Sequence, residues 1–268
     1  MIAIRTVAQR LLFSLLAFLC VGNARASDDV AAGANDEPSV TPYRPTVSNP
    51  ADLSALGWLE FEAGALSVDA ADSTHVDTLP WLLKYAFSEN SGVLVGGNAY
   101  DRVRAASARI SGFGDTFVEW KQRLPVREGI AFGIEAGVEL PTAPSSVGIG
   151  KPAYIVNAIY SSDFGAMHLD VNMGGTRYTS YPVHASSWQN MWAAAVSHPL
   201  AGEDFGIAFE LSGAAQRGAD HSHQALAAIN YNASRRVVLD FGAAYGLDRA
   251  AHDRSLFCGG TFLLGKLR

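Results

Sequence analysis

The eleven residues 130–140 constrain the fold of this chain more than any other stretch. Every even position holds Ile, Phe, Ala, Val or Leu, and every odd position holds Ala, Gly or Glu. Neighbouring side chains on an extended strand point to opposite faces, so this stretch predicts a strand with one apolar face and one face of small or acidic groups. A tilted strand of about 9–11 residues crosses a bilayer, whereas an ordinary strand has about 5–6 residues.

The same alternation recurs along the chain from Trp58 onward. Short connections alternate with longer ones, as in outer-membrane barrels with tight periplasmic turns and longer external loops. The sequence therefore predicts an all-β protein, an antiparallel up-and-down transmembrane β-barrel of about 12 strands. The expected strands are 58–67, 76–87, 92–101, 114–124, 129–140, 152–161, 165–176, 188–198, 204–215, 223–233, 236–247 and 255–267.

Residues 1–26 have the features of a secretory signal peptide. Arg5 and Arg10 precede the apolar run 11–21, and Ala24-Arg25-Ala26 offers a small-residue cleavage site before Ser27. The apolar run is too short for a membrane helix. We therefore expect cleavage near Ala26-Ser27 and export to the bacterial outer membrane.

The mature chain is expected to have two parts. Residues 27–56 are rich in Asp, Ala, Pro, Ser and Asn and show neither period, which predicts a flexible periplasmic lead. Residues 57–268 form the barrel. Only Cys258 remains after cleavage, so an internal disulfide is excluded, and the formal net charge of −6 argues against nucleic acid as a partner.

Ionisable side chains occupy the strand faces opposite the apolar ones. A Lys or Arg facing lipid at the bilayer midplane costs about 2–4 kcal/mol, so these groups are expected to face the barrel interior. There they either line a solute path or pair with one another as a polar plug. The expected lumen-lining residues are Glu60, Glu62, Lys84, Glu119, Lys121, Arg123, Glu135, Glu139, His168, Asp170, Glu210 and Asp240.

Several short motifs, in a fixed order, resemble a known family. They are Arg44-Pro45-Thr46-Val47-Ser48-Asn49-Pro50-Ala51, Gly57, Glu60-x-Glu62-x-Gly64, Gly112-Phe113-Gly114-Asp115-Thr116 with Lys121 and Leu124, and Leu140-Pro141-Thr142. Together they resemble the outer-membrane barrels of the MetA-pathway of phenol degradation family. The resemblance implies a Gram-negative outer-membrane barrel that passes small, often apolar or aromatic compounds inward.

Two features depart from that family. Pro141-Thr142-Ala143 stands where the family usually has Pro-Thr-Gly, and the chain ends in Lys266-Leu267-Arg268 rather than in an aromatic residue. Phe262 would then have to serve as the aromatic signal for the outer-membrane assembly machinery. Besides that machinery, the expected partners are outer-membrane lipid and a small-molecule solute.

The favoured function is a channel or transporter rather than an enzyme, with no cofactor and no metal. A receptor or purely structural barrel is the main alternative. A lipid hydrolase is a weaker one, resting on His184-Ala185-Ser186 and Asn190, whose spacing does not secure a base beside the nucleophile. His168, Asp170 and Asn172 have the types of metal ligands, but alternate polar residues on one inward strand are also typical of a hydrated interior.

Overall fold

The computed structural model describes residues 38–180, 185–200, 204–219, 221–248 and 253–267. From Trp58 onward they form one antiparallel sheet that closes on itself, because β1 pairs with both β2 and β13 and β2 also pairs with β3. Within them, no helix has the length and apolar composition to span a membrane. The strands are β1 (Trp58–Asp69), β2 (His75–Ala86), β3 (Ser91–Ala105), β4 (Ala108–Gly112), β5 (Thr116–Arg127), β6 (Ile130–Leu140), β7 (Ala153–Phe164), β8 (Met167–Tyr178), β9 (Trp188–Pro199), β10 (Phe205–Gln216), β11 (Ser222–Ser234), β12 (Val237–Gly246) and β13 (Arg254–Lys266).

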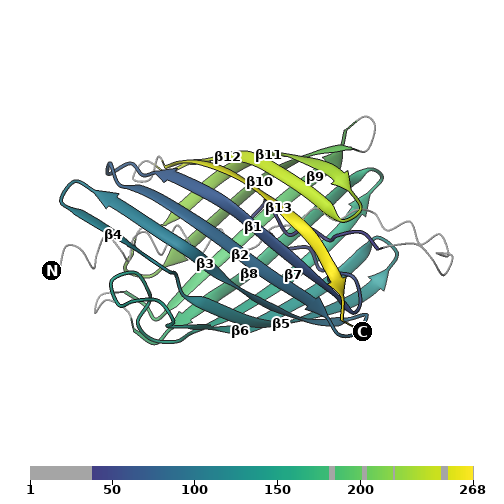
Figure 1. Ribbon diagram of the computed structural model, residues 1–268, viewed down its shortest axis with the longest axis horizontal. Helices are drawn as coiled ribbons and strands as arrows, with labels where there is room; N and C mark the ends of the chain where they lie inside the picture. Colours follow the sequence, from purple (N-terminus) through teal and green to yellow (C-terminus); the bar gives the residue numbers. More distant parts are fainter. Residues whose placement is uncertain (1–37, 181–184, 201–203, 220, 249–252, 268) are drawn as a thin grey trace.

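The wall has twelve strand positions, because β4 and β5 share one side of β3. β5 pairs with the first part of β3, and β4 pairs with its last part. The prediction of a twelve-stranded antiparallel barrel is therefore confirmed (Figure 1). The expected strands 92–101 and 114–124 leave 102–113 as a connection, and this is wrong, because β3 continues to Ala105 and β4 covers Ala108–Gly112. Val103 packs against an apolar cluster inside the barrel.

The two ends of the barrel differ. The turn end carries the tight connections 87–90, 128–129, 165–166 and 235–236, together with the end of β13, and the loop end carries the connections 70–74 and 141–152. In Figure 1 the loop end lies at the left, beside β4, and the turn end lies at the right, where the C-terminus is marked.

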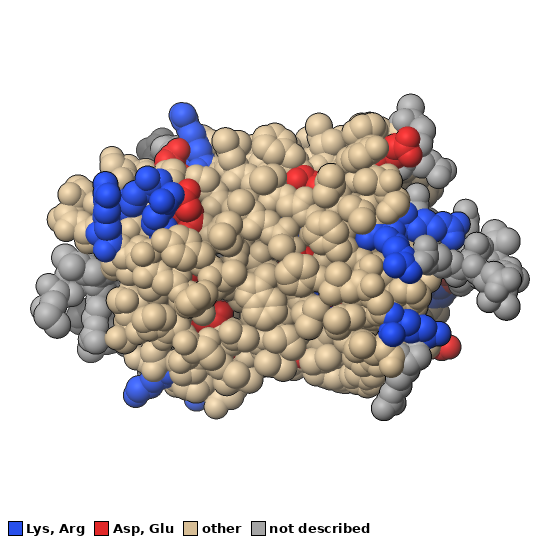
Figure 2. Space-filling model, viewed as in Figure 1, with Lys and Arg blue, Asp and Glu red and all other residues tan. Residues whose placement is uncertain are grey.

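The outer surface of the barrel is apolar around its middle. Figure 2 shows a broad belt without Lys or Arg on this face, with basic side chains gathered at the two ends. The strands build this belt by alternation, since every second residue is exposed to the outside while its neighbours are buried. Exposed members include Trp120, Phe132, Ile134, Val156, Met173, Trp192, Phe209, Leu211, Leu239 and Phe241.

Apolar side chains fill one side of the interior toward the loop end. Leu66, Val68, Val76 and Phe257 are buried there beside residues from β11 and β12. The opposite side of the interior, between β5 and β10, is predominantly polar.

Candidate functional site in the barrel lumen

Residues 38–56, here called the lumen segment, lie inside the barrel. The backbone N–H of Val40 donates to the carbonyl of Arg235 at the turn end, and Leu56 forms a bridge with Ala86 at the same end. Between these points, residues such as Tyr43 and Asn49 are fully buried. The segment thus enters the lumen from the turn end and returns to it.

The prediction of a flexible lead outside the barrel is wrong for residues 38–56. This segment has no strand or helix period because prolines interrupt it at 42, 45 and 50, and proline supplies no backbone donor. Six of its N–H groups, those of Thr41, Tyr43, Val47, Ser48, Asn49 and Ala51, donate to side chains of the wall, which holds the segment in place without secondary structure. Residues 27–37 lie outside the described residues.

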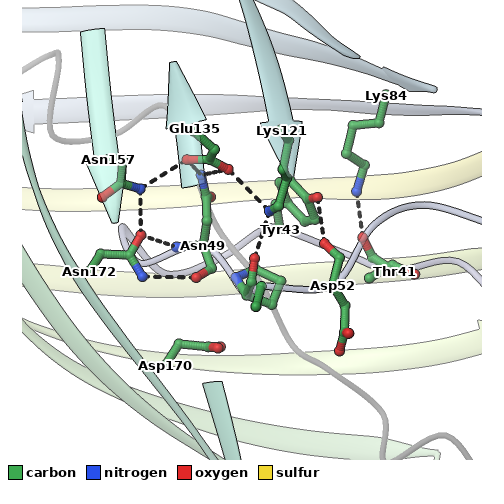
Figure 3. Close-up of polar contacts among 12 residues, drawn as sticks. Thr41, Tyr43, Asn49, Asp52, Lys84, Lys121, Glu135, Asn157, Asp170 and Asn172 are labelled. Carbon is green, nitrogen blue, oxygen red and sulfur yellow. Dashed lines mark hydrogen bonds and ion pairs between the residues drawn. The ribbon is translucent and has the colours of Figure 1, made fainter. Parts of the chain in front are cut away.

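The first part of the segment is bound by carboxylates of β1. The N–H of Thr41 donates to Glu60 at 2.9 Å, and the N–H of Tyr43 donates to Glu62 at 2.6 Å. Lys84 on β2 is fully buried between these two carboxylates and also donates to the carbonyl of Thr41 (Figure 3). A buried cation is thereby matched with two buried anions.

The ring of Tyr43 lies between two buried cations. The Nζ atoms of Lys84 and Lys121 each lie 4.0 Å from its centroid, as expected of cation–π contacts. Its hydroxyl donates to the carbonyl of Asp52 at 2.7 Å. This bond links the part of the segment that enters the lumen to the part that returns to the turn end. Burial, reinforced by nearby carboxylates such as Glu135, raises the pKa of Tyr43 well above its usual value, so the hydroxyl stays protonated as a donor.

Two facing glycines make room for Arg44. Gly64 on β1 pairs with Gly259 on β13, and a Cβ atom at either position would lie 2.6 Å or less from the Arg44 guanidinium group. The guanidinium group lies beside these glycines and donates to both oxygens of Asp240 at 2.9 and 3.0 Å. Close backbone approach is what requires glycine at both positions.

The apex of the segment is held by acidic and amide groups of the opposite wall. The N–H groups of Val47 and Ser48 donate to one oxygen of Glu210 at 2.7 and 2.8 Å. Asn49 exchanges hydrogen bonds of 2.9 and 2.8 Å with Asn172, and its side chain donates to Glu135 (Figure 3). Sequence reasoning did not foresee this use of an internal asparagine.

The part of the lumen segment that runs back to the turn end, here called the returning limb, is held by basic residues of β5. Lys121 donates to the carbonyl of Pro50 at 2.6 Å and lies 3.1 Å from Glu135. Arg123, which is partly exposed, pairs with Asp52 at 2.7 Å. Strand β5 thus holds the returning limb through both Pro50 and Asp52.

The twelve residues predicted to line the lumen separate into three groups. Eight contact the lumen segment directly: Glu60, Glu62, Lys84, Lys121, Arg123, Glu135, Glu210 and Asp240. His168 lies between Asp163 and Asp170, and Asp170 also accepts a hydrogen bond from Ser161, which itself accepts the N–H of Ala51. Glu119 and Glu139 are buried but do not contact the segment in any of the described hydrogen bonds or ion pairs.

A cavity of about 70 Å³ lies beyond the apex of the segment. Val47 of the segment contributes to its lining, and the other lining residues come from β5 to β10. They include Glu119, Glu139, Phe117 and Ile155. The lumen is therefore filled at the turn end and retains space toward the loop end.

The residues of the hydrolase alternative do not form a described nucleophile–base pair. Ser186 accepts the backbone N–H of Trp188 at 3.1 Å, and Asn190 accepts the indole N–H of the same residue at 2.7 Å. His184 lies outside the described residues. Among the residues that are described, no three His, Cys, Asp or Glu side chains gather as a metal site.

The barrel is similar in fold to solved outer-membrane channels. An outer-membrane channel from Pseudomonas putida F1 matches with a TM-score of 0.64 at 10% identity, covering 80% of this chain and 97% of that one. The NanC porin matches with a TM-score of 0.55 at 10% identity, covering 77% and 100%, and the KdgM porin with 0.53 at 9%, covering 77% and 99%.

Sequence comparisons add nothing to this likeness. No protein-family model and no curated protein matches the chain. The fold is thus that of an outer-membrane barrel, and the resemblance to the MetA-pathway family stays a prediction.

Proposed function

We propose that this protein is an outer-membrane channel for uptake of small molecules, in which the lumen segment forms the constriction. One observation carries the proposal. A single chain segment fills the turn-end half of the lumen and is held there by hydrogen bonds and ion pairs to the wall. A barrel wall alone does not need such a segment. The channel identities of the structural neighbours agree with this reading but establish only the fold.

The orientation follows from the two ends. Outer-membrane barrels keep tight turns and both termini on the periplasmic side, so the turn end is assigned to the periplasm and the loop end to the exterior. We further propose that residues 1–26 are removed as a signal peptide and that residues 57–268 span the membrane. A solute from outside would then meet the cavity first and the lumen segment second.

The proposed solutes are small and partly apolar. Phe117, Ile155 and Met191 contribute apolar surface to the cavity. An apolar cavity of about 150 Å³ accommodates benzene, so a space of about 70 Å³ takes an aromatic ring only if the lumen segment or a side chain moves. Aromatic compounds are therefore proposed as solutes of an opened state, and smaller molecules as solutes of the closed one.

Liposome swelling and single-channel conductance test this proposal. The mature protein and a variant lacking residues 38–56 are compared on a panel of neutral solutes of increasing size, with Glu89→Gln on the turn 87–90 as a control for reconstitution. We expect slow, size-limited swelling for the mature protein and faster, less selective swelling for the deletion variant. A folded deletion variant that conducts nothing would contradict the channel.

A structural or receptor barrel remains the second candidate. The many contacts between the lumen segment and the wall favour this candidate, because they are what a fixed plug would need. The same deletion distinguishes the two functions. If the segment is only a structural plug, the deletion variant should lose barrel stability, and the intact protein should show no solute selectivity.

A further inference from the structure

The cavity beyond the lumen segment is acidic. Three of its lining residues are glutamates, and among the described residues that line it none is Lys, Arg or His. The lining is Val47, Phe117, Glu119, Glu135, Glu139 and Ile155, joined by residues of β7 to β10. A site built in this way has more acidic than basic side chains and favours a cationic ligand.

Glu135 is already neutralised. Lys121 lies 3.1 Å from it, and the side-chain amides of Asn49 and Asn157 each donate to it at 2.9 Å. Its carboxylate therefore needs no further partner. The acidic side chains of the cavity without an ion pair among the described residues are Glu119 and Glu139.

Glu119 and Glu139 face the cavity from neighbouring strands. Glu119 pairs in register with Gly137, two residues before Glu139, so the two glutamates are diagonal neighbours on the inner face with Cα atoms about 7–8 Å apart. A Cβ atom at Gly137 would lie 2.5 Å from Cγ of Glu119, so the glycine lets that side chain lie against the wall. Both are buried, and within the described part of the chain neither has a direct cationic partner.

Unused polar atoms point to a ligand at this site. Oε2 of Glu139 and Oγ1 of Thr176 are buried without a hydrogen-bond partner among the described residues. Thr176 is fully buried and lines the cavity from β8. Buried polar atoms are rarely left without partners, since each costs about 1–3 kcal/mol.

The walls between these polar atoms are apolar. Phe117 is 3% exposed and pairs in register with Glu139, and Ile155 lies across from it on β7. A hydrated metal ion gains nothing from such surface, whereas the carbon chain of an organic cation does.

We propose that this cavity binds a small primary ammonium ion carried on a short apolar chain. The ammonium group is placed against Glu119 and Glu139, where Thr176 completes its hydrogen bonds, and the chain lies against Phe117 and Ile155. This inference rests on the proposed channel and names the solute class that its outer half selects. A four-carbon chain is about as large as an aromatic ring, so an ion of that length also needs the lumen segment or a side chain to move.

Calorimetric titration of the full mature protein in detergent tests the proposal without requiring transport. The probes are n-butylammonium, 1-butanol and butyrate, which share a carbon chain and differ in charge. We expect n-butylammonium to bind more tightly than 1-butanol and butyrate not to bind. Equal binding of n-butylammonium and 1-butanol, or no binding of n-butylammonium, would overturn the proposal, and neither result affects swelling with neutral solutes.

Variants locate the binding site. Glu119→Gln combined with Glu139→Gln should weaken n-butylammonium binding at least about tenfold, because a buried charge pair is lost while shape is kept. Glu89→Gln is the matched control and should bind as the unmodified protein does. Thr176→Val provides a second variant that retains both carboxylates, and it should weaken binding by a smaller factor. Unchanged binding in a folded double variant would place the ligand elsewhere and refute the assignment.

Discussion

The two halves of the lumen use buried charge in opposite ways. Toward the turn end, Lys84 and Lys121 of the wall pair with carboxylates and donate to carbonyls of the lumen segment, and Arg44 of the segment pairs with Asp240 of the wall. Toward the loop end, Glu119 and Glu139 line a cavity and have no such match among the described residues. A filled half stabilises a closed state, whereas an unfilled half with unmatched charge is suited to a ligand.

The largest expected effect lies in the filled half. Lys121→Gln removes the cation between Glu135 and the carbonyl of Pro50, and breaking a buried ion pair costs about 3–5 kcal/mol. Urea unfolding of the folded barrel in lipid should show this loss, with Lys151→Gln in the exposed connection 141–152 as the control. A loss below about 1 kcal/mol would mean that the two halves do not differ as described.

The double variant Lys121→Gln with Arg123→Gln tests the filled half of the lumen by transport measurements. The pair holds the returning limb through Pro50 and Asp52, so the double change should release the lumen segment and raise leakage without much ion preference. If both residues instead lined an open aqueous path, reversal potentials would shift toward cations. Conductance and reversal potential, measured on the same preparation, distinguish these outcomes.

The wall of the barrel could be predicted because its signal is local. Alternation over about 9–11 residues fixes both the strand and its inward face, and therefore the inward direction of Glu60, Lys84 and Asp240. The short β4 hairpin was missed because the sequence between Val103 and Gly112 carries Arg104 and Arg109 and no sustained apolar alternation, so that it resembles a polar loop. There the pairing of Asp77 with Arg102 and Arg104 stabilises an extension of the sheet.

The lumen segment could not be predicted from the sequence by periodicity. Its conformation depends on hydrogen bonds to Glu62, Glu210 and Asn172, residues separated from it by up to 163 positions. The facing glycines Gly64 and Gly259 were the available signal, because small residues on an inward face mark where another backbone or a side chain comes close. That the twelve residues form a solute path stays a prediction, which the transport measurements test.

A glycine substitution in the unfilled half should have an intermediate effect. A Cβ atom at Gly137 would lie 2.3 Å from the carbonyl oxygen of Val118 and 2.5 Å from Cγ of Glu119, so Gly137→Ala forces the wall and the carboxylate apart. Overpacking of this kind costs about 1–3 kcal/mol. Gly265→Ala is the matched control, because nothing lies within 4 Å of its added Cβ. Equal unfolding midpoints for the two variants would show that Glu119 does not depend on the glycine.

The smallest expected effect is also the most direct contrast between the halves. Glu139→Gln replaces a buried carboxylate that has no cationic partner in the described chain with a neutral group of nearly the same shape. Because this buried carboxyl group has an oxygen without a hydrogen-bond partner, its replacement should leave the free energy of unfolding unchanged or raise it by up to about 1 kcal/mol, opposite in sign to Lys121→Gln. Urea unfolding at neutral pH, without any amine present, measures this difference. In the presence of n-butylammonium the order should reverse, since only the unmodified protein gains stability from the bound ligand. A loss of several kcal/mol for Glu139→Gln without ligand would show that this carboxylate is already paired and that the outer half is as filled as the inner one.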